Sequence, residues 1–475
     1  MNGPIRKVSG FVAVLMALLL VNITYLTVFR ADDLNADGRN RRVRDAEFAQ
    51  NRGAILVGNQ PIAESVPNEG RFPWIRNYPD PHTWSSVTGW YSYFYARSGL
   101  EQSFNEELAG TSADQSIGRI VDLLTGRSSQ GANVSTTLNA GAQEAAVKAL
   151  GDKRGAVVAM NYTTGEILAL VSTPTYDPNK LATVDLAESQ SAWSELLDSP
   201  DEPLKNRATR EVYPPGSTFK LITAAAALED GLVPDSMVDS PASLRLPNSS
   251  RSIGNSTNCG GTRVTLQQAL LTSCNTAFAN IGLEVGADKL RAQAEKFGFN
   301  QDQTIDIAAA ISRFPGELDE AQTALSSIGQ YEVAASPLQI VQVAAAIAND
   351  GVSMKPYLVS TVTNRDLTVL NSTSPSELGR PISEATAKHL QQMMVATVEE
   401  GTGKPAQIDG LVIGGKTGTA QSDPDRPPYA WFVGYAEDPQ VAIVAFVENA
   451  DVARDDISGG KLAAPIFTTV LEALR

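Results

Sequence analysis

Residues 8–29 form an apolar stretch without a charged side chain, and this stretch sets the first limit on how the chain can fold. A helix of this length crosses the hydrocarbon core of a bilayer, whereas the apolar core of a signal peptide is usually shorter. No A-x-A cleavage site follows the stretch. We therefore predict that residues 1–30 form a short cytoplasmic tail and an uncleaved membrane anchor, with a cleaved signal peptide as the alternative.

The charges around this stretch do not settle its orientation. Arg6 and Lys7 precede it, but five arginines follow it within residues 30–44. The cytoplasmic side of a membrane span usually carries the excess of Lys and Arg, so this count alone favours the reverse topology. Long domains that follow a span are translocated largely regardless of charge. The orientation therefore depends on the chemistry of the downstream residues.

Composition excludes several classes of function. The chain has 475 residues and a net charge of −15, so it is long enough for two or three domains, and nucleic acid is not expected as a partner. It has two cysteines, which form no CxxC pair, and two histidines, His82 and His389. These residues cannot assemble a familiar zinc cluster and leave little room for a Ser-His-Asp enzyme. We expect no metal and no cofactor.

Patterning beyond the anchor divides the chain near residue 150. Residues 31–150 are mixed and loop-rich, and many aromatic residues lie between positions 71 and 104. From residue 155 two apolar runs flank a Thr-Thr-Gly turn, and a second pair of runs lies near the C-terminus. Ala-rich helical patterns fill the sequence between these two hairpins. We predict an α+β domain over residues 151–475, with one antiparallel sheet shared by distant chain segments.

The stretch EVYPPGSTFK, residues 211–220, places a serine and a lysine at the start of a predicted helix. Ser217 and Lys220 are three residues apart, so on a helix they share one face and can touch. A hydroxyl becomes a good nucleophile when a base lies beside it, and a lysine with a lowered pKa can be that base. The alternative is an N-capping serine followed by a surface lysine.

A single S-x-x-K pattern is weak evidence, because Ser458 and Lys461 match it as well. Two later patterns separate these candidates: S-x-N at residues 273–275 and K-T-G at residues 416–418. The S-x-N pattern also has chance matches, but K-T-G occurs once. The order S-x-x-K, S-x-N, K-T-G is the signature of the penicillin-recognising serine enzymes. Ser458 follows K-T-G, so Ser217 is the predicted nucleophile.

The S-x-N residues need a particular local structure to act together. Ser273 and Asn275 are two positions apart, so on a helix their side chains would diverge. In a turn between two helices both can enter a cleft, and Cys274 then points behind it. A plain helix cap is the alternative for this pair.

The stretch IGGKTGTA is typical of a strand beside a cleft. Its glycines would let a peptide backbone approach and add as a further strand. We expect Lys416 to supply positive charge, and Thr417 and Thr419 on either side of Gly418 to hold a substrate carboxylate. Backbone N–H groups of Ser217 and Thr419 would form an oxyanion hole.

With their flanks, these motifs resemble the class B penicillin-binding proteins, most of all the short penicillin-binding protein A type of actinobacteria. The resemblance covers nearly the whole chain. Its main landmarks are RGAIL and TGWYS near the N-terminus, then TTGEILALVSTPTYDPN, NRATREVYPPGSTFK, SSIGQYEVAASPLQI and PPYAWFVGYA. Two features depart from the pattern of some members: cysteine occupies the middle of S-x-N, and no glycosyltransferase domain precedes the serine domain.

The resemblance implies a fold and an activity. The fold would be a penicillin-binding, serine β-lactamase-like transpeptidase domain, with helices on both faces of an antiparallel sheet. A pedestal or dimerisation-like domain in residues 31–150 would precede it. The activity would be that of a D,D-transpeptidase: Ser217 attacks the penultimate D-Ala of a peptidoglycan stem peptide, and the acyl group passes to a neighbouring strand. Lys220 would be the acylation base, and Ser273 would relay a proton. β-Lactams would trap Ser217.

The same resemblance implies a location and a partner. The catalytic domain would lie outside the cytoplasmic membrane, held by a single-pass anchor. A polytopic glycan polymerase of the shape, elongation and division (SEDS) type would contact the anchor and the pedestal. Two alternatives remain: a D,D-carboxypeptidase or β-lactamase, which passes the acyl group to water, and a β-lactam sensor that does not turn over.

Cys259 and Cys274 are either two free thiols or a disulfide. The loop between them is short, and the outer compartment implied by the resemblance is oxidising. We predict that they form a disulfide behind the S-x-N turn.

Overall fold

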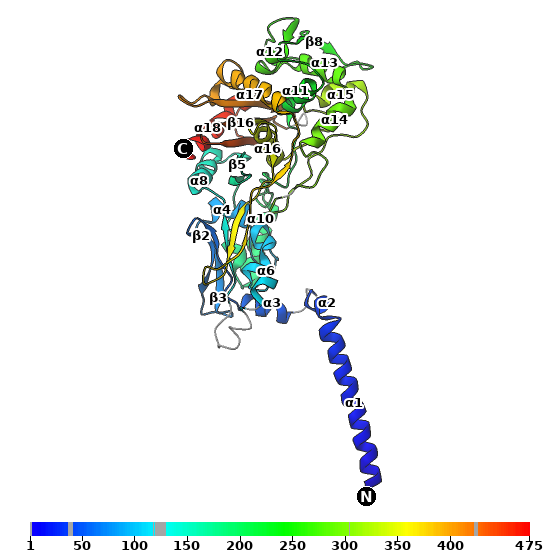
Figure 1. The fold of residues 1–475 in the computed structure, drawn as a ribbon. Helices are drawn as coiled ribbons and strands as arrows, with labels where there is room; N and C mark the ends of the chain where they lie inside the picture. Colours follow the sequence, from blue (N-terminus) through cyan, green and yellow to red (C-terminus); the bar gives the residue numbers. More distant parts are fainter. Residues whose placement is uncertain (1, 37–40, 117, 119–129, 304, 422–425) are drawn as a thin grey trace.

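Three parts follow one another from bottom to top in Figure 1: a long helix, a lower module and an upper domain. The structure is a computed structural model. It describes residues 2–36, 41–116, 118, 130–303, 305–421 and 426–475. Arg39, one of the five arginines counted after the apolar stretch, lies outside the described residues.

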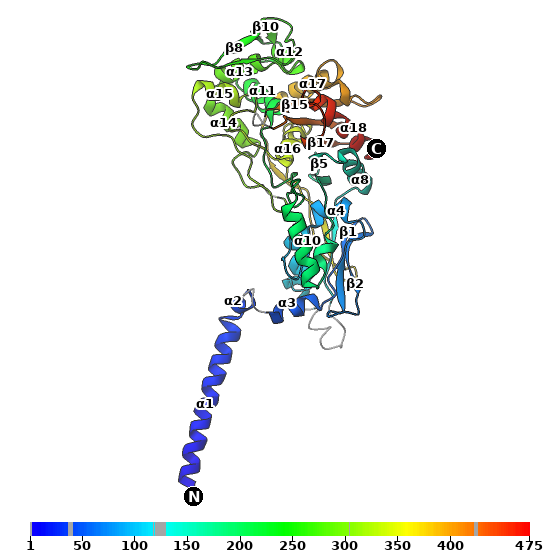
Figure 2. The same ribbon diagram turned by 180° about the vertical axis from the view of Figure 1, so that it is seen from behind.

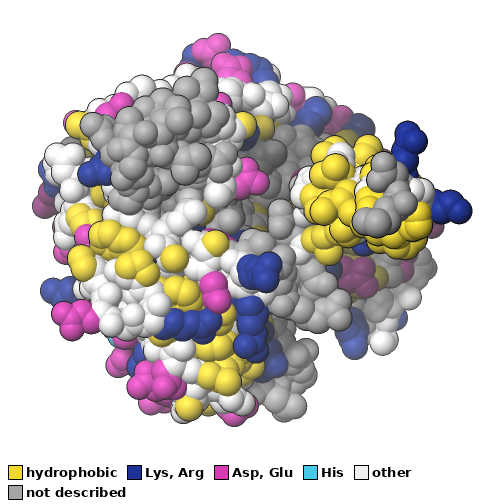
Figure 3. Space-filling model, turned by 90° about the horizontal axis from the view of Figure 1, so that it is seen from below, with side chains coloured by type: hydrophobic (Ala, Val, Ile, Leu, Met, Phe, Trp, Pro, Cys, Tyr) yellow, Lys and Arg dark blue, Asp and Glu magenta, His cyan; other side chains and the backbone are white. Residues whose placement is uncertain are grey.

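The apolar stretch forms helix α1, Asn2–Val28. Figure 3 shows the helix from below, with hydrophobic side chains over most of its surface. Its large apolar side chains are exposed, since no other part of the described chain covers them. By length and composition the stretch Gly3–Val28 can cross a membrane. This observation supports an N-terminal anchor, and a signal sequence would pass the same test.

A six-stranded sheet in the order β13-β12-β4-β1-β2-β3 forms the frame of the lower module. Two of its strands come from far along the chain, because β12 pairs antiparallel with β4 and places Val362 opposite Val134. The sheet therefore combines segments from both sides of the boundary that we expect near residue 150. Its strands are β1 (Ile55–Val57), β2 (Gln60–Pro67), β3 (Trp74–Asn77), β4 (Asn133–Thr136), β12 (Val359–Thr363) and β13 (Val369–Ser372).

Short helices surround this sheet, and two of them also come from beyond residue 150. Figure 2 shows α10 against the lower module. The amide of Asn179 on α9 bonds to both backbone groups of Tyr78, at 2.9 and 3.0 Å, and the ring of Trp193 on α10 contacts Trp90. The helices are α3 (Arg41–Phe48), α4 (Pro81–Thr88), α5 (Gly99–Ser103), α6 (Asn105–Leu108), η1 (Ala113–Gln115), α9 (Asn179–Ala182) and α10 (Leu186–Asp198), whereas α2 (Ala31–Ala36) lies beside the end of α1 (Figure 1).

A buried cluster of charged side chains links α5 of the lower module to the chain segments before and after β1 and β2. Glu101 is fully buried and accepts from Arg52 Nε at 2.7 Å and from Arg76 Nε at 2.6 Å. Arg76 also donates to the backbone oxygen of Gly53 at 2.7 Å. The two guanidinium groups hold the pKa of Glu101 below its usual value, although burial acts in the opposite direction. This carboxylate is therefore the common counter-charge of both arginines.

The upper domain has a five-stranded antiparallel sheet in the order β15-β16-β17-β5-β6. Strand β17 pairs with β5 and sets Val444 opposite Val158, so the two predicted hairpins share one sheet. Helices α8 and α18 cover one face, and α11 and α16 lie on the other (Figure 1). The strands are β5 (Arg154–Asn161), β6 (Ile167–Thr173), β15 (Ile413–Ala420), β16 (Tyr429–Ala436) and β17 (Val441–Asn449).

The remaining elements of this domain are helices and small strands that form two-stranded sheets. The helices are α8 (Ala140–Leu150), η2 (Gly216–Phe219), α11 (Lys220–Glu229), α12 (Leu266–Leu271), α13 (Asn275–Val285), α14 (Ala287–Lys296), α15 (Glu320–Ser326), α16 (Pro337–Ala348), α17 (Glu384–Glu399), η3 (Lys404–Ala406), η4 (Arg454–Asp456), η5 (Gly459–Ala463) and α18 (Ala464–Ala473). The small strands are β7 (Met237–Asp239), β8 (Ser243–Arg245), β9 (Ser252–Gly254), β10 (Arg263–Thr265), β11 (Ser353–Met354) and β14 (Glu377–Gly379).

Candidate active site

Ser217 lies in η2, a single tight turn that leads directly into α11. The turn starts at Gly216, whose φ of 53° is unfavourable for any residue with a Cβ. A Cβ at this position would also lie 2.9 Å from the Cβ of Ala420 at the end of β15. Gly216 therefore lets the turn approach β15 closely. Ser217 is partly exposed, whereas the three residues that follow it, Thr218, Phe219 and Lys220, are buried.

Lys220 begins α11 and is fully buried. Its Nζ lies 2.7 Å from the backbone oxygen of Ser273, 2.7 Å from Asn275 Oδ1 and 3.3 Å from Ser273 Oγ. Within the described part of the chain, these hydrogen bonds lead to the S-x-N turn and none joins Lys220 to Ser217. Burial lowers the pKa of Lys220 well below its ordinary value, and the charge of Lys416 acts in the same direction.

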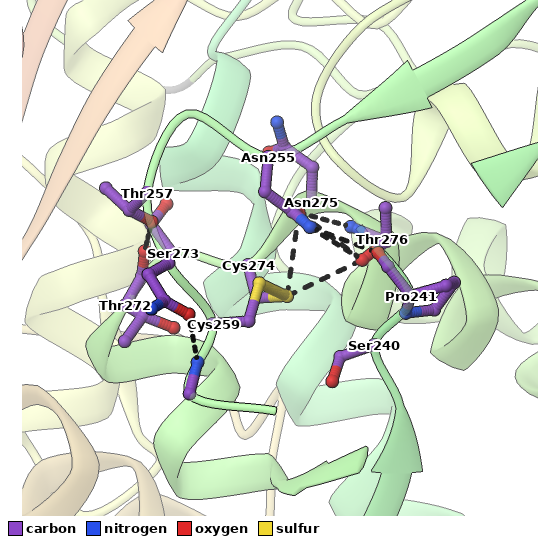
Figure 4. The surroundings of a disulfide bond; sticks show 12 residues. Ser240, Pro241, Asn255, Thr257, Cys259, Thr272, Ser273, Cys274, Asn275 and Thr276 are labelled. Atoms are coloured by element: carbon purple, nitrogen blue, oxygen red, sulfur yellow. Dashed lines mark hydrogen bonds between the residues drawn. A yellow bond between two sulfur atoms is a disulfide. The ribbon is translucent and has the colours of Figure 1, made fainter. Parts of the chain in front are cut away.

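Ser273 occupies the turn between α12 and α13, as the spacing of S-x-N predicts. It has a φ of 57°, a left-handed conformation that turns the chain sharply. Cys274 is buried behind the turn and bonded to Cys259 (Figure 4). Asn275 starts α13, and its Nδ2 donates to the backbone oxygen of Gly254 at 2.9 Å. The side chains of Ser273 and Asn275 thus meet at Lys220.

The segment before Cys259 packs on this turn through an asparagine that the motifs do not include. Asn255 Oδ1 accepts from the backbone N–H of Thr276 at 3.0 Å. Its Nδ2 lies 3.0 Å from Thr276 Oγ1 and 3.2 Å from the backbone oxygen of Pro241 (Figure 4). No sequence signal marks Asn255, because its partners are 14 and 21 residues away.

Lys416 lies on β15 and is also fully buried. Its Nζ donates to Ser273 Oγ at 2.8 Å and to the backbone oxygen of Thr417 at 2.9 Å. Burial lowers the pKa of Lys416 to about 7. Ser273 Oγ therefore lies between two lysine amines, and the environment of each amine lowers its pKa. The structure brings together Lys220, Ser273 and Lys416 from three distant elements.

Among the described residues β15 is an edge strand of its sheet, because it pairs with β16 alone. The outer edge can accept the backbone of a peptide. The glycines have a different role from the one we expected. A Cβ at Gly414 would meet the ring of Tyr435 at 2.3 Å, and one at Gly415 would meet Phe432 at 2.6 Å. These glycines accommodate neighbouring rings of β16.

Residues 417–419 of β15 lie next to η2, the turn that bears Ser217. A Cβ at Gly418 would lie 2.9 Å from Thr218 Cγ2, so glycine permits close packing of the strand on the turn. Thr417 is largely buried, whereas Thr419 is exposed. Alternate residues of a strand face the same side, which places both hydroxyls on one side of β15.

Thr402 was not predicted from the sequence, yet it contacts a residue of the K-T-G motif. Its Oγ1 lies 2.8 Å from Thr417 Oγ1, and its backbone N–H donates to the oxygen of Leu271 at 3.2 Å. A Cβ at Gly401 would lie 2.4 Å from that same Leu271 oxygen. Glycine there lets the loop reach both β15 and the end of α12. The Gly-Thr-Gly run at residues 401–403 was the available signal.

Ser458 and Lys461 form no comparable site. Ser458 Oγ accepts from the backbone N–H of Lys461 at 3.3 Å and caps η5, and Lys461 Nζ pairs with Asp456 at 2.8 Å. The structure therefore agrees with the rejection of this second S-x-x-K match.

Known proteins match this architecture. Residues 155–472 match the family described as "Penicillin binding protein transpeptidase domain", and residues 52–134 match "Penicillin binding protein A dimerisation domain". The chain belongs to the penicillin-binding transpeptidase family. The peptidoglycan D,D-transpeptidase PbpA of Mycolicibacterium smegmatis is 44% identical to this transpeptidase, over 100% of this chain and 99% of the relative. The protein of the same name from Mycobacterium tuberculosis is 41% identical over the same shares.

Solved structures of penicillin-binding protein A have the same fold as this chain. Penicillin-binding protein A from M. tuberculosis, in a ceftriaxone acyl-enzyme complex, superposes on this transpeptidase with a TM-score of 0.87 and 39% identity. The alignment covers 90% of this chain and 99% of that chain. An imipenem acyl-enzyme complex of the same protein gives a TM-score of 0.86. The predicted family, fold class and enzyme class are therefore confirmed.

Proposed function

We propose that this transpeptidase cross-links peptidoglycan stem peptides through an acyl-enzyme on Ser217. The observation that carries the proposal is the chain of atoms Lys416 Nζ–Ser273 Oγ–Lys220 Nζ, with steps of 2.8 and 3.3 Å, behind the turn that bears Ser217. Both amines lose protons more readily than an exposed lysine does. A base and a proton relay are therefore available without a histidine.

Acylation begins when Ser217 Oγ attacks the carbonyl carbon of the penultimate D-Ala. The C–O bond forms while the proton of the hydroxyl moves to neutral Lys220 Nζ. Negative charge develops on the carbonyl oxygen, where the backbone N–H groups of Ser217 and Thr419 can stabilise it. The close packing of η2 against β15, where a Cβ on Gly216 would lie 3.0 Å from the backbone oxygen of Thr419, supports this role.

Collapse of this intermediate breaks the C–N bond to the terminal D-Ala. The leaving amine needs a proton, which passes from Lys220 through Ser273 Oγ. An amine of a neighbouring stem peptide then attacks the acyl-enzyme and gives up a proton by the same route. The new amide bond is the cross-link, and Ser217 is regenerated.

Substrate recognition uses the free edge of β15. The donor peptide adds as a further strand, and its terminal carboxylate lies near the hydroxyls of Thr417 and Thr419, with Lys416 behind them. A β-lactam presents a carboxylate and a reactive carbonyl in a similar arrangement, so it would acylate Ser217 and remain bound. The solved relative carries ceftriaxone and imipenem as acyl-enzymes.

Helix α1 would hold the protein in the cytoplasmic membrane, with the lower module and the catalytic domain on the outer side, where peptidoglycan is assembled. The lower module and α1 would then be the surfaces available to a polytopic glycan polymerase of the SEDS type. This arrangement requires the tail before α1 to be cytoplasmic.

Labelling with a fluorescent penicillin, followed by a cross-linking assay on lipid-linked glycan chains, tests the proposal. We expect Ser217→Ala to abolish both the label and the cross-links, and Ser458→Ala to leave both intact. A label that persists in Ser217→Ala would refute the assignment of the nucleophile. Release of D-Ala without cross-links would identify a carboxypeptidase, and a stable label without any turnover of stem peptide would identify a sensor.

A further inference from the structure

A cavity of about 290 Å³ lies where the lower module meets the transpeptidase domain. Its walls come from α4 and α5, from the loop after β6, and from the 203–210 segment that leads toward Ser217. No residue of the three motifs lines it. Its volume is near the lower end for sites that hold small organic ligands.

Arg210 gives this cavity a cation that forms no ion pair with a carboxylate of the described residues. The nearby Lys205 Nζ pairs with Glu202 at 2.9 Å and with Glu211 at 3.9 Å. Among the residues that the structure describes, none forms an ion pair with Arg210, whose side chain is exposed. A guanidinium in this state can bind a carboxylate with two parallel hydrogen bonds.

The other walls offer uncharged polar groups beside an aromatic ring. Ser85, Gln102 and Ser103 line the cavity, and their side chains form no hydrogen bond within the described chain; Ser85 is buried, and the other two residues are exposed. The indole of Trp90 is held in place, because its Nε1 donates to the oxygen of Tyr95 at 3.0 Å. Hydroxyls, an amide and a fixed aromatic ring suit a ligand with a C–H face and several hydroxyl or amide groups.

The cavity is joined to the nucleophile through one well-anchored segment. Asn206 lines the cavity and donates to the backbone oxygen of Ser86 at 2.8 Å. The next residue, Arg207, is fully buried and pairs with Glu448 on β17. Farther on, Trp431 Nε1 donates to the oxygen of Pro214 at 3.1 Å. A ligand in the cavity therefore rests on the same rigid segment that positions Ser217.

We infer that this cavity binds one sugar–peptide unit of a peptidoglycan strand, at a distance from the bond that is cut. The ligand class is an N-acetylated amino sugar joined to a short peptide that carries a free carboxylate: Arg210 takes the carboxylate of the peptide, and Gln102 and the serines take the amide and hydroxyl groups. The inference rests on the proposed function, because a cross-linking enzyme acts on a polymer that extends past Ser217. A second grip on this polymer raises the local concentration of stem peptides at the active site.

Binding to a blocked enzyme tests the inference directly. The full-length protein in detergent is first acylated with penicillin, and binding of a soluble disaccharide-tripeptide is then measured by calorimetry. The tripeptide lacks D-Ala-D-Ala, so it is a poor ligand for the active site. We expect the acylated protein to bind this fragment, and Arg210→Gln to weaken binding roughly tenfold, because one charge-assisted pair is lost.

The matched control is Arg365→Gln, which makes the same change at an exposed turn between β12 and β13. This variant should bind the fragment as the wild type does. A second variant, Gln102→Leu, removes an amide from another wall and should also weaken binding. If acylation abolishes binding of the fragment, or if Arg210→Gln binds it unchanged, the cavity is not a glycan site. Failure of penicillin to acylate the protein would instead refute the proposed function.

Turnover gives an independent readout. The ratio of kcat/KM for polymeric glycan to that for a free stem pentapeptide should fall roughly tenfold in Arg210→Gln, because only the polymer reaches both sites. An unchanged ratio would overturn the inference, since a merely structural effect would lower both values together.

Discussion

At the scale of single residues, this site depends on two lysines with different surroundings. Burial lowers the pKa of both lysines, and the pKa of Lys220 is lowered further by the charge of Lys416. Both amines lie beside the hydroxyl of Ser273. Because their pKa values are perturbed, one amine can be neutral and accept a proton while the other amine stays protonated. The division of roles can be tested at each residue.

Lys220→Arg should fail to acylate although it keeps the positive charge, because a guanidinium does not lose a proton at working pH. We expect the rate of acylation by penicillin to fall by more than tenfold, which corresponds to about 1.4 kcal/mol in the barrier. Stopped-flow measurement of the acylation rate checks this. An arginine variant within tenfold of wild type would mean that Lys220 is only a charge in the cleft and that another group is the base.

The pKa of Lys416 predicts a pH dependence. With a pKa of about 7, Lys416 is positively charged below this pH and neutral above it. If its charge attracts the substrate carboxylate, kcat/KM for acylation should decline as pH rises above about 7. Lys416→Arg should retain the charge and shift this decline to much higher pH. A decline at the same pH in both proteins would assign it to a different group.

Thr402 should act through Thr417, because their hydroxyls lie 2.8 Å apart. Thr402→Val keeps the shape but removes the hydroxyl, at a cost of about 1 kcal/mol for one neutral hydrogen bond. We expect KM for the donor peptide to rise roughly fivefold with little change in kcat, and Thr402→Ser to restore it. Thr468→Val, which removes an exposed hydroxyl on α18, is the control. A fall in kcat with KM unchanged would exclude this positioning role.

At the scale of elements, the S-x-N turn is held from behind by the segment that ends at Cys259. The disulfide joins this segment to the start of α13, and Asn275 and Asn255 bond across the same contact. Ser273 has a left-handed backbone, so the turn needs support from its neighbours to keep its hydroxyl between the lysines.

Loss of the disulfide should therefore weaken the turn without removing a reacting group. The bond closes a loop with a sequence separation of 15, which in the chain-entropy model stabilises the fold by roughly 3 kcal/mol. We expect the double variant Cys259→Ser, Cys274→Ser to unfold at lower urea concentration and to acylate more slowly, with Ser217 still labelled. A reductant should have the same effect on the wild type and none on the double variant. Equal stability of both proteins would contradict the prediction.

At the scale of the whole molecule, the two modules share chain segments. Strands β12 and β13 come after most of the catalytic helices, yet they complete the sheet of the lower module. Helices α9 and α10 also leave the upper domain and pack below it. The lower module is therefore part of the folding unit that carries the active site.

A chain of residues 151–475 should consequently fold poorly on its own. Without β4, strand β12 loses one of its two neighbours, and the edge that contains Val362 becomes exposed. We expect this chain to aggregate or to unfold at lower temperature than a chain of residues 31–475, and to bind less fluorescent penicillin per mole. Equal thermal stability and labelling of the two chains would show that the transpeptidase domain does not need the segments before residue 151.

The sequence by itself determined the features that depend on local pattern. The uncharged stretch predicted α1, and the paired apolar runs predicted the hairpins of the upper sheet. The order of three short motifs selected Ser217 over Ser458. Spacing alone also placed Ser273 in a turn, because two residues that are two apart cannot share a helical face. Each of these inferences needs only neighbours along the chain.

Tertiary structure alone decided which distant groups meet. Lys416 Nζ donates to Ser273 Oγ, although 143 positions separate the two residues in the sequence. Thr402 contacts Thr417 because Gly401 lets the loop that carries Thr402 approach the end of α12. The return of β12 to the lower sheet and the cavity beside Arg210 likewise arise where separate segments pack. Such contacts depend on how the hydrophobic faces of whole elements are buried against one another, and a local sequence pattern carries no record of that arrangement.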